Sequence, residues 1–255
     1  MPKGISLLIV GTEGVGKTSF AAEFPKPIDF YSMSETGCED LIDLGKISDQ
    51  FVTDYVIDSF QELLTRIRNS QARTIVLDSV SGLQRVIFNY CASEDYGGDY
   101  DAFLDYYKGP RQQCPAYADQ LCSLLENKRR EGVHVILLAH TKVETIKNPK
   151  GLDYTTFEID ADEGIRSVFK KYMANILFMD LDPGTERVTK SLKGKAIEAK
   201  MKDHDIRVIF TQKSLTHTAK NKLDLPLVIP MGDSPEEAYD TFVDKLPPLF
   251  KDQLQ

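Results

Sequence analysis

The chain has 255 residues, of which 42% are hydrophobic and 27% are charged, a composition typical of a folded globular protein rather than a disordered one. Lysine and arginine total 31 against 39 aspartate and glutamate residues, which gives a formal net charge of −8. This acidic balance argues against a domain that coats nucleic acid by charge alone, although a local basic groove is compatible with it. No stretch approaches the roughly 20 apolar residues that span a bilayer, so we expect neither a membrane protein nor a secreted one.

The four cysteines are spread along the chain, and no pair has the C-x-x-C spacing typical of zinc sites. A chain of this length does not need disulfide bridges to hold its core. We therefore interpret the cysteines as reduced packing residues of a cytoplasmic protein. They are Cys38, Cys91, Cys114 and Cys122.

Short apolar runs alternate with amphipathic segments through most of the chain. This alternation is typical of βαβ units and predicts an α/β fold with a mostly parallel, twisted sheet flanked by helices. Pro25 and Pro27 are expected to end the first helix, and the capping-box pattern of Ser59 and Glu62 to begin the second. The predicted strands are Ile5–Val10, Ile28–Tyr31, Thr74–Leu77, Val133–Ala139 and Ile176–Leu181; the predicted helices are Lys17–Phe24, one that begins at Phe60, and Ala116–Glu131.

The pattern changes after about residue 185, where short mixed segments are separated by turns. We expect these segments, Ala196–Lys202, Arg207–Thr211 and Leu227–Ile229, to form β-hairpins attached to the same sheet. A short helix is predicted at Pro235–Phe242. No linker rich in glycine, serine or proline divides the chain, so we predict one domain over residues 1–255, with a core at about 4–185 and a β extension at about 186–255.

The most specific pattern follows the first predicted strand, where residues 11–18 read G-T-E-G-V-G-K-T and match G-x-x-x-x-G-K-[ST]. The glycines let the backbone wrap closely, so that consecutive N–H groups point at phosphate oxygens and the lysine reaches the β- and γ-phosphates. A buried strand before the loop and a helix after it are the context that this motif requires. We predict a nucleoside triphosphate site made by Gly11, Thr12, Glu13, Gly14, Val15, Gly16, Lys17, Thr18 and Ser19.

A later strand ends in an acid, since Thr74–Leu77 leads directly into Asp78. In P-loop NTPases an aspartate in this position holds Mg²⁺, together with the hydroxyl of the loop threonine. The alternative is a strand-end aspartate that caps the following turn. Because Asp78 follows the phosphate loop by one helix-containing crossover, we predict that Thr18 and Asp78 hold Mg²⁺.

Asp78 is followed by Ser79 and not by a second acid, so a base for the attacking water must come from another segment. Residues 29–37, D-F-Y-S-M-S-E-T-G, provide one after the second strand. With this segment the chain resembles the RecA-like ATPases, and more closely the phage RecA-like proteins of the Sak single-strand-annealing group and related phage nucleotide-binding proteins. The resemblance implies a RecA-like P-loop NTPase core, in which Glu35 activates water. The alternative is that Glu35 is an exposed acid of a surface loop.

The resemblance continues over roughly residues 4–230. Val133–Ala139 is followed by His140, where RecA usually has a glutamine that senses the γ-phosphate; histidine can also donate a hydrogen bond to phosphate, while a strand-end histidine bonded to backbone is the alternative. Long loops around residues 91–111 and 141–162 occupy the positions where RecA relatives contact single-stranded DNA. Both carry aromatic and basic residues beside many acids, so an aromatic lid over acidic surface is an equal alternative for the first. The residues concerned are Tyr96, Tyr100, Phe103, Tyr106, Tyr107, Lys108 and Arg111 in the first loop, and Lys142, Lys147, Lys150, Tyr154 and Phe157 in the second.

Residues 218–226, T-A-K-N-K-L-D-L-P, resemble the Lys-Asn-Arg motif of RadA-type proteins. That resemblance implies that Lys220 and Lys222 reach the nucleotide of a neighbouring subunit as an arginine finger does, with Lys200 and Lys202 as weaker candidates. Solvated surface lysine is the alternative. The letters N-K-L-D also match the guanine-reading motif of GTPases, but no buried strand precedes them here, which argues against a GTPase.

The resemblance implies a Mg²⁺-dependent, DNA-stimulated ATPase that acts on single-stranded DNA in phage recombination or strand annealing. Its expected partners are single-stranded DNA, a host single-strand-binding protein and further copies of itself in a ring or filament, in the cytoplasm of a bacterial host. The alternative is a small-molecule or nucleotide kinase on the same loop, which would need an arginine-rich lid where Arg111 stands almost alone. A nucleotide-switched scaffold with little turnover is the third hypothesis.

Overall fold

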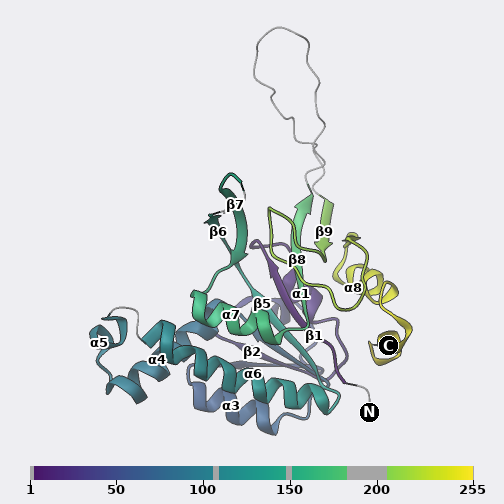
Figure 1. Cartoon of the computed structure of the whole chain (residues 1–255). Coiled ribbons are helices and arrows are strands. Elements are labelled where there is room, and N and C mark those ends of the chain that lie inside the picture. Colours follow the sequence, from purple (N-terminus) through teal and green to yellow (C-terminus); the bar gives the residue numbers. More distant parts are fainter. Residues whose placement is uncertain (1–2, 106–108, 148–150, 183–205, 255) are drawn as a thin grey trace.

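The computed structural model describes residues 3–105, 109–147, 151–182 and 206–254, which form an eight-stranded sheet with helices on both faces (Figure 1). The strand order is β10-β9-β8-β1-β5-β4-β2-β3. The six strands from β8 to β3 are parallel, and β9 and β10 add to the β8 edge in antiparallel pairing. The strands are β1 (Ser6–Gly11), β2 (Ile28–Ser32), β3 (Val52–Val56), β4 (Thr74–Asp78), β5 (His134–Ala139), β8 (Asn175–Asp182), β9 (Ile206–Phe210) and β10 (Val228–Pro230).

Each face of the sheet carries its own apolar cluster. Side chains alternate along a strand, so Leu8 and Val10 of β1 point to one face while Leu7 and Ile9 point to the other, and all four are fully buried. Helices α3, α4, α6 and α7 cover the first face, and α1, α2, α8 and α9 cover the second. The helices are α1 (Lys17–Ala21), α2 (Gly37–Asp43), α3 (Phe60–Asn69), α4 (Val80–Tyr96), α5 (Tyr100–Leu104), the π-helix η2 (Gly109–Gln113), α6 (Cys114–Arg130), α7 (Glu163–Tyr172), α8 (Pro235–Asp244) and α9 (Pro248–Leu254).

The predicted α/β fold, its mostly parallel sheet and its C-terminal antiparallel strands are confirmed. Ser59 caps α3 as expected, since its hydroxyl accepts from the Glu62 amide at 3.4 Å, while the Glu62 carboxylate pairs with Arg66 at 2.7 Å. The first helix ends at Ala21 rather than Phe24, because the amides of Glu23 and Phe24 bond to carbonyls three residues back. The predicted segment Ala196–Lys202 lies outside the described residues.

The first predicted long loop, residues 91–111, is largely helical in its described part. It contains the end of α4, all of α5 and part of η2. Phe103 is fully buried, and the rings of Tyr96 and Tyr100 pack against it with centroids 5.6 and 5.3 Å away. Phe103 therefore serves packing, while contact of this segment with DNA stays a prediction; Tyr106, Tyr107 and Lys108 lie outside the described residues.

The second predicted loop is also regular. Strands β6 (Thr141–Ile146) and β7 (Tyr154–Ile159) pair antiparallel as the β6–β7 hairpin, which stands off the edge of the main sheet in Figure 1. Exposed residues alternate with half-buried ones along most of β6. The sequence did not indicate a strand here because charged and polar residues lie on both faces, so apolar and polar residues do not alternate. The four cysteines are buried as expected. No helix in the described ranges is long and apolar enough to cross a membrane.

Candidate nucleotide-binding site

The phosphate loop joins the end of β1 to the start of α1. Gly14 and Gly16 have φ values of 73° and 99°, in the left-handed region that glycine adopts without strain. Gly11 packs so closely on the neighbouring strand β8 that a Cβ there would lie 2.5 Å from the Met179 carbonyl oxygen. The loop glycines are therefore required by the backbone geometry, as the sequence motif predicts.

Lys17 lies over its own loop. Its Nζ atom donates to the carbonyl oxygens of Gly11 at 2.9 Å and Thr12 at 2.8 Å, and the residue is only 7% exposed. Burial lowers the pKa of this amine, partly offset by the charges of Asp78 and Glu35. The ammonium group is thus held at the rim of the loop, where an incoming phosphate would meet it.

Thr18 and Asp78 come together as predicted. The Thr18 hydroxyl donates to Oδ2 of Asp78 at 3.0 Å, which links the start of α1 to the end of β4. Asp78 is 5% exposed, and burial raises the pKa of its carboxyl to about 6, with the Thr18 hydrogen bond acting in the opposite direction. A hydroxyl and a carboxylate side by side offer the hard oxygen ligands that Mg²⁺ prefers, so the two residues fit the predicted ion.

Glu35 and His140 also meet at this edge of the sheet. One oxygen of Glu35, Oε1, accepts from the Ser79 hydroxyl at 3.0 Å and lies 3.2 Å from Nε2 of His140. Glu35 follows β2, Ser79 follows β4 and His140 follows β5, and the carboxyl ends of parallel strands share one edge. The other ring nitrogen of His140 is buried without a hydrogen-bond partner among the described residues, so the imidazole is held through Glu35.

A cavity of about 330 Å³ lies between these groups. It lies within the size range typical of small-molecule sites. Most predicted site residues line it: Glu13, Gly14, Gly16, Lys17, Thr18, Ser19, Glu35, Asp78 and His140. Helix α2 supplies three further lining residues that sequence reasoning missed, namely Gly37, Asp40 and Leu41. The one signal in the sequence was position, because Gly37 ends the segment 29–37 that also carries Glu35.

Lys220 and Lys222, the two predicted lysine fingers that the structure describes, do not line this cavity. Nζ of Lys220 donates to the carbonyl oxygens of Lys170 at 3.0 Å and Met173 at 2.8 Å, which caps the end of α7 in the same chain. Lys222 is exposed. Lys200 and Lys202 lie outside the described residues. A role at a neighbouring subunit stays a prediction for all four.

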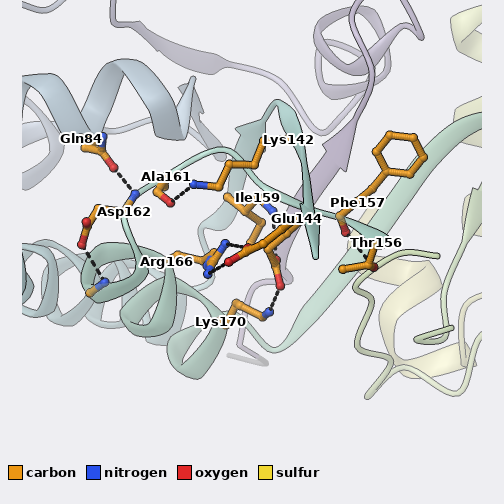
Figure 2. Close-up of polar contacts among 12 residues, drawn as sticks. Gln84, Lys142, Glu144, Thr156, Phe157, Ile159, Ala161, Asp162, Arg166 and Lys170 are labelled. Carbon is orange, nitrogen blue, oxygen red and sulfur yellow. Dashed lines mark hydrogen bonds and ion pairs between the residues drawn. The ribbon is translucent and has the colours of Figure 1, made fainter. Parts of the chain in front are cut away.

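The β6–β7 hairpin is fixed to α7 by ion pairs, drawn in Figure 2. Arg166 contacts Glu144 at 2.6 Å, and Lys170 contacts Glu158 at 2.7 Å. Lys142, expected to track DNA phosphates, donates to the Ala161 carbonyl oxygen at 2.9 Å. The base of the hairpin is therefore held rigidly beside the site.

No curated protein matches this chain. Among solved structures, a KaiC-like protein from the hyperthermophilic archaeon Pyrococcus horikoshii is similar, with 17% sequence identity, a TM-score of 0.45, and coverage of 92% of this chain and 88% of the other. A family model described as an AAA domain matches residues 3–223. The chain therefore belongs to the AAA domain family of P-loop ATPases.

Proposed function

We propose that the protein is a Mg²⁺-dependent ATPase that acts on single-stranded DNA in phage recombination or strand annealing. The observation that carries the proposal is the convergence of Lys17, the Thr18–Asp78 pair and the Glu35–His140 pair around one cavity. These groups supply a phosphate-binding cation, oxygen ligands for a metal, and a carboxylate base. Together they match the parts that phosphoryl transfer to water requires.

On binding ATP, Lys17 would exchange its two loop carbonyl partners for phosphate oxygens. Thr18 and Asp78 would hold Mg²⁺, which supplies positive charge to the phosphates. The Thr18–Asp78 hydrogen bond already places both ligand oxygens on one side of the loop. Little rearrangement is needed to form the loaded site.

Glu35 is positioned to act on water. Its carboxylate is one-third exposed and is oriented by Ser79 and His140, so it can accept a proton from a water molecule in the cavity. As the water oxygen attacks the γ-phosphorus, the bond to the ADP oxygen breaks and the water proton passes to Glu35. This assigns turnover to Glu35 and nucleotide binding to the loop.

His140 connects the site to the hairpin. It is the one residue between β5 and β6, and its carbonyl oxygen accepts from the Asp160 amide at 2.9 Å at the end of β7. A γ-phosphate that draws the imidazole away from Glu35 would therefore pull on both ends of the hairpin. This is how ATP binding would be communicated to a DNA-binding element.

The DNA part of the proposal draws support from the surface beside the hairpin. A cavity of about 490 Å³ lies there, and its walls include rings from β7, β8, β9 and the segment after β9. The buried Phe178 and His217 rings stack on each other at 4.6 Å and form the floor, while Phe157 and Phe210 are only partly buried and can meet a base. Exposed Lys213 lies on the rim. Stacking surfaces with a nearby cation are typical of single-strand binding without sequence preference.

Hydrolysis assays with and without single-stranded DNA at low salt test this function. The proposal predicts ATP hydrolysis that DNA stimulates. It also predicts DNA binding that is weak because the chain is acidic and that salt weakens further because binding releases counterions from the phosphates. Absence of both stimulation and binding with a non-hydrolysable analogue would overturn the DNA role. Phosphate transfer to nucleosides or nucleotides much faster than hydrolysis would favour the kinase, and tight ATP binding without turnover would favour the scaffold.

We further propose that the ATPase assembles into a ring or filament in which Lys222 reaches a neighbouring nucleotide. Lys222 is better placed for this than Lys220, because its side chain is exposed and Lys220 is occupied within its own chain. Imaging with an ATP analogue, single-stranded DNA and a host single-strand-binding protein tests assembly and partners together. Only monomers under these conditions would contradict the proposal.

A further inference from the structure

Arg207 stands at the phosphate-loop end of the sheet. Gly11, Met179 and Ile209 face one another across β1, β8 and β9. Because β9 runs antiparallel to β1, residues before Ile209 in β9 lie beyond the end of β1, level with the phosphate loop. The register pairs Arg207 with Leu181, two residues further toward that end.

The side chain of Arg207 points to the face that carries the loop. Residues two apart in a strand share a face, and Ile209 packs in the same cluster as Val15 and Phe20. A Cβ built on Gly16 would lie 3.6 Å from Nη1 of Arg207. The guanidinium group thus lies beside the last glycine of the phosphate loop, in the same chain.

Within the described residues one hydrogen bond holds this guanidinium, which leaves further N–H donors for a ligand. Nη2 donates to the Asp233 carbonyl oxygen at 3.2 Å, which holds one edge of the group. No ion pair joins Arg207 to a carboxylate within the described part of the chain. Lys17 and Arg207 each bring a cation to this loop, Lys17 through its bonds to the Gly11 and Thr12 carbonyls and Arg207 beside Gly16.

We propose that Arg207 binds the triphosphate of the nucleotide in cis. The proposal rests on the ATP site described above and adds a phosphate-binding residue from the C-terminal antiparallel strands. An arginine suits this position because its planar fork can donate to a phosphate while one edge stays bonded to the Asp233 carbonyl. The β extension would then complete the nucleotide site rather than only extend the sheet.

Calorimetric titration of full-length protein with Mg²⁺-ATP and Mg²⁺-GTP tests this assignment. Arg207→Met keeps the length of the side chain and removes the charge, and Arg207→Lys keeps the charge without the fork. Exposed Arg68 on α3, which packs on the opposite face of the sheet, supplies the matched control Arg68→Met. Thermal melting of each variant checks that it is folded.

We expect Arg207→Met to bind ATP about 10-fold to 100-fold more weakly, with Arg207→Lys between it and the wild type and Arg68→Met unchanged. Because phosphate is common to both nucleotides, loss of a phosphate contact should weaken the binding of ATP and of GTP by the same factor. Unchanged ATP affinity of folded Arg207→Met would overturn the inference and leave the ATP site standing. A loss of affinity for only one of the two nucleotides would do the same, because it would indicate contact with the base. Failure of the wild type to bind any nucleotide would instead overturn the proposed function and this inference with it.

Discussion

Replacement of Glu35 by glutamine separates chemistry from binding at this site. Glutamine has nearly the same shape, and its amide oxygen can still accept from the Ser79 hydroxyl, as Oε1 of Glu35 does at 3.0 Å. Glu35 lies outside the phosphate loop, so the substitution leaves the contacts between the loop and phosphate intact. The substitution therefore removes basicity while it leaves the cavity in place.

The expected loss follows from the role of the carboxylate. A positioned general base contributes about 10²-fold to 10⁴-fold to a rate, so we expect the single-turnover hydrolysis rate of Glu35→Gln to fall by that factor. The dissociation constant for ATP should change by no more than about threefold, since loop and Lys17 contacts are intact. Rapid-quench measurement of phosphate release, with nucleotide affinity measured separately, gives both quantities.

Glu13 is the matched control. It lines the same cavity but is exposed and belongs to the loop, where the backbone rather than the carboxylate contacts phosphate. Glu13→Gln should hydrolyse ATP at close to the wild-type rate. Hydrolysis by Glu35→Gln within a factor of about three of the wild type would refute the assignment of the base.

Three further variants test the structure around the site. Lys220→Met should lower the free energy of unfolding by about 1–2 kcal/mol, because two carbonyls at the end of α7 lose their donor; exposed Lys222→Met should not, and equal stability of the two would contradict the capping role. Burial lowers the pKa of His134 to about 4. As the pH falls, the unfolded chain therefore binds this proton before the folded one, and the free energy of unfolding should fall by roughly 3 kcal/mol between pH 6.5 and pH 4. Urea titrations should show a weaker pH dependence for His134→Gln, and an unchanged one would exclude this group as the cause. A Cβ at Gly82 would lie 1.8 Å from the Met33 carbonyl oxygen, so Gly82→Ala should lower the free energy of unfolding by about 1–3 kcal/mol and shift the segment that carries Glu35. Melting and activity equal to the wild type would contradict this steric requirement.

The parts of the site that sequence could predict are those fixed by local geometry. The phosphate loop needs glycines at set positions between a strand and a helix, and Gly14 and Gly16 adopt the left-handed conformations that this implies. The carboxyl ends of parallel strands meet at one edge of the sheet. Asp78 and His140 follow predicted parallel strands, so the sequence could place both on the same edge as the phosphate loop.

What could not be predicted depends on long-range register. Arg207 reaches the loop only because β9 pairs antiparallel with β8 in one particular register, and no motif surrounds it. Lys220 reads as a motif residue in sequence, yet a bridge between it and Ile176 turns its side chain toward the end of α7. The aromatic run near Phe103 likewise could not reveal whether its rings face solvent or one another.

The central claim is that the loop after β1 binds a nucleoside triphosphate with Mg²⁺. Calorimetric titration of the wild-type protein and of Lys17→Ala with Mg²⁺-ATP measures this directly, because the Lys17 ammonium is held at the rim of the loop. We expect saturable binding to the wild type and an affinity lower by about 100-fold or more in the variant. Absence of binding heat with any purine triphosphate, or equal affinity of the two proteins, would contradict the account.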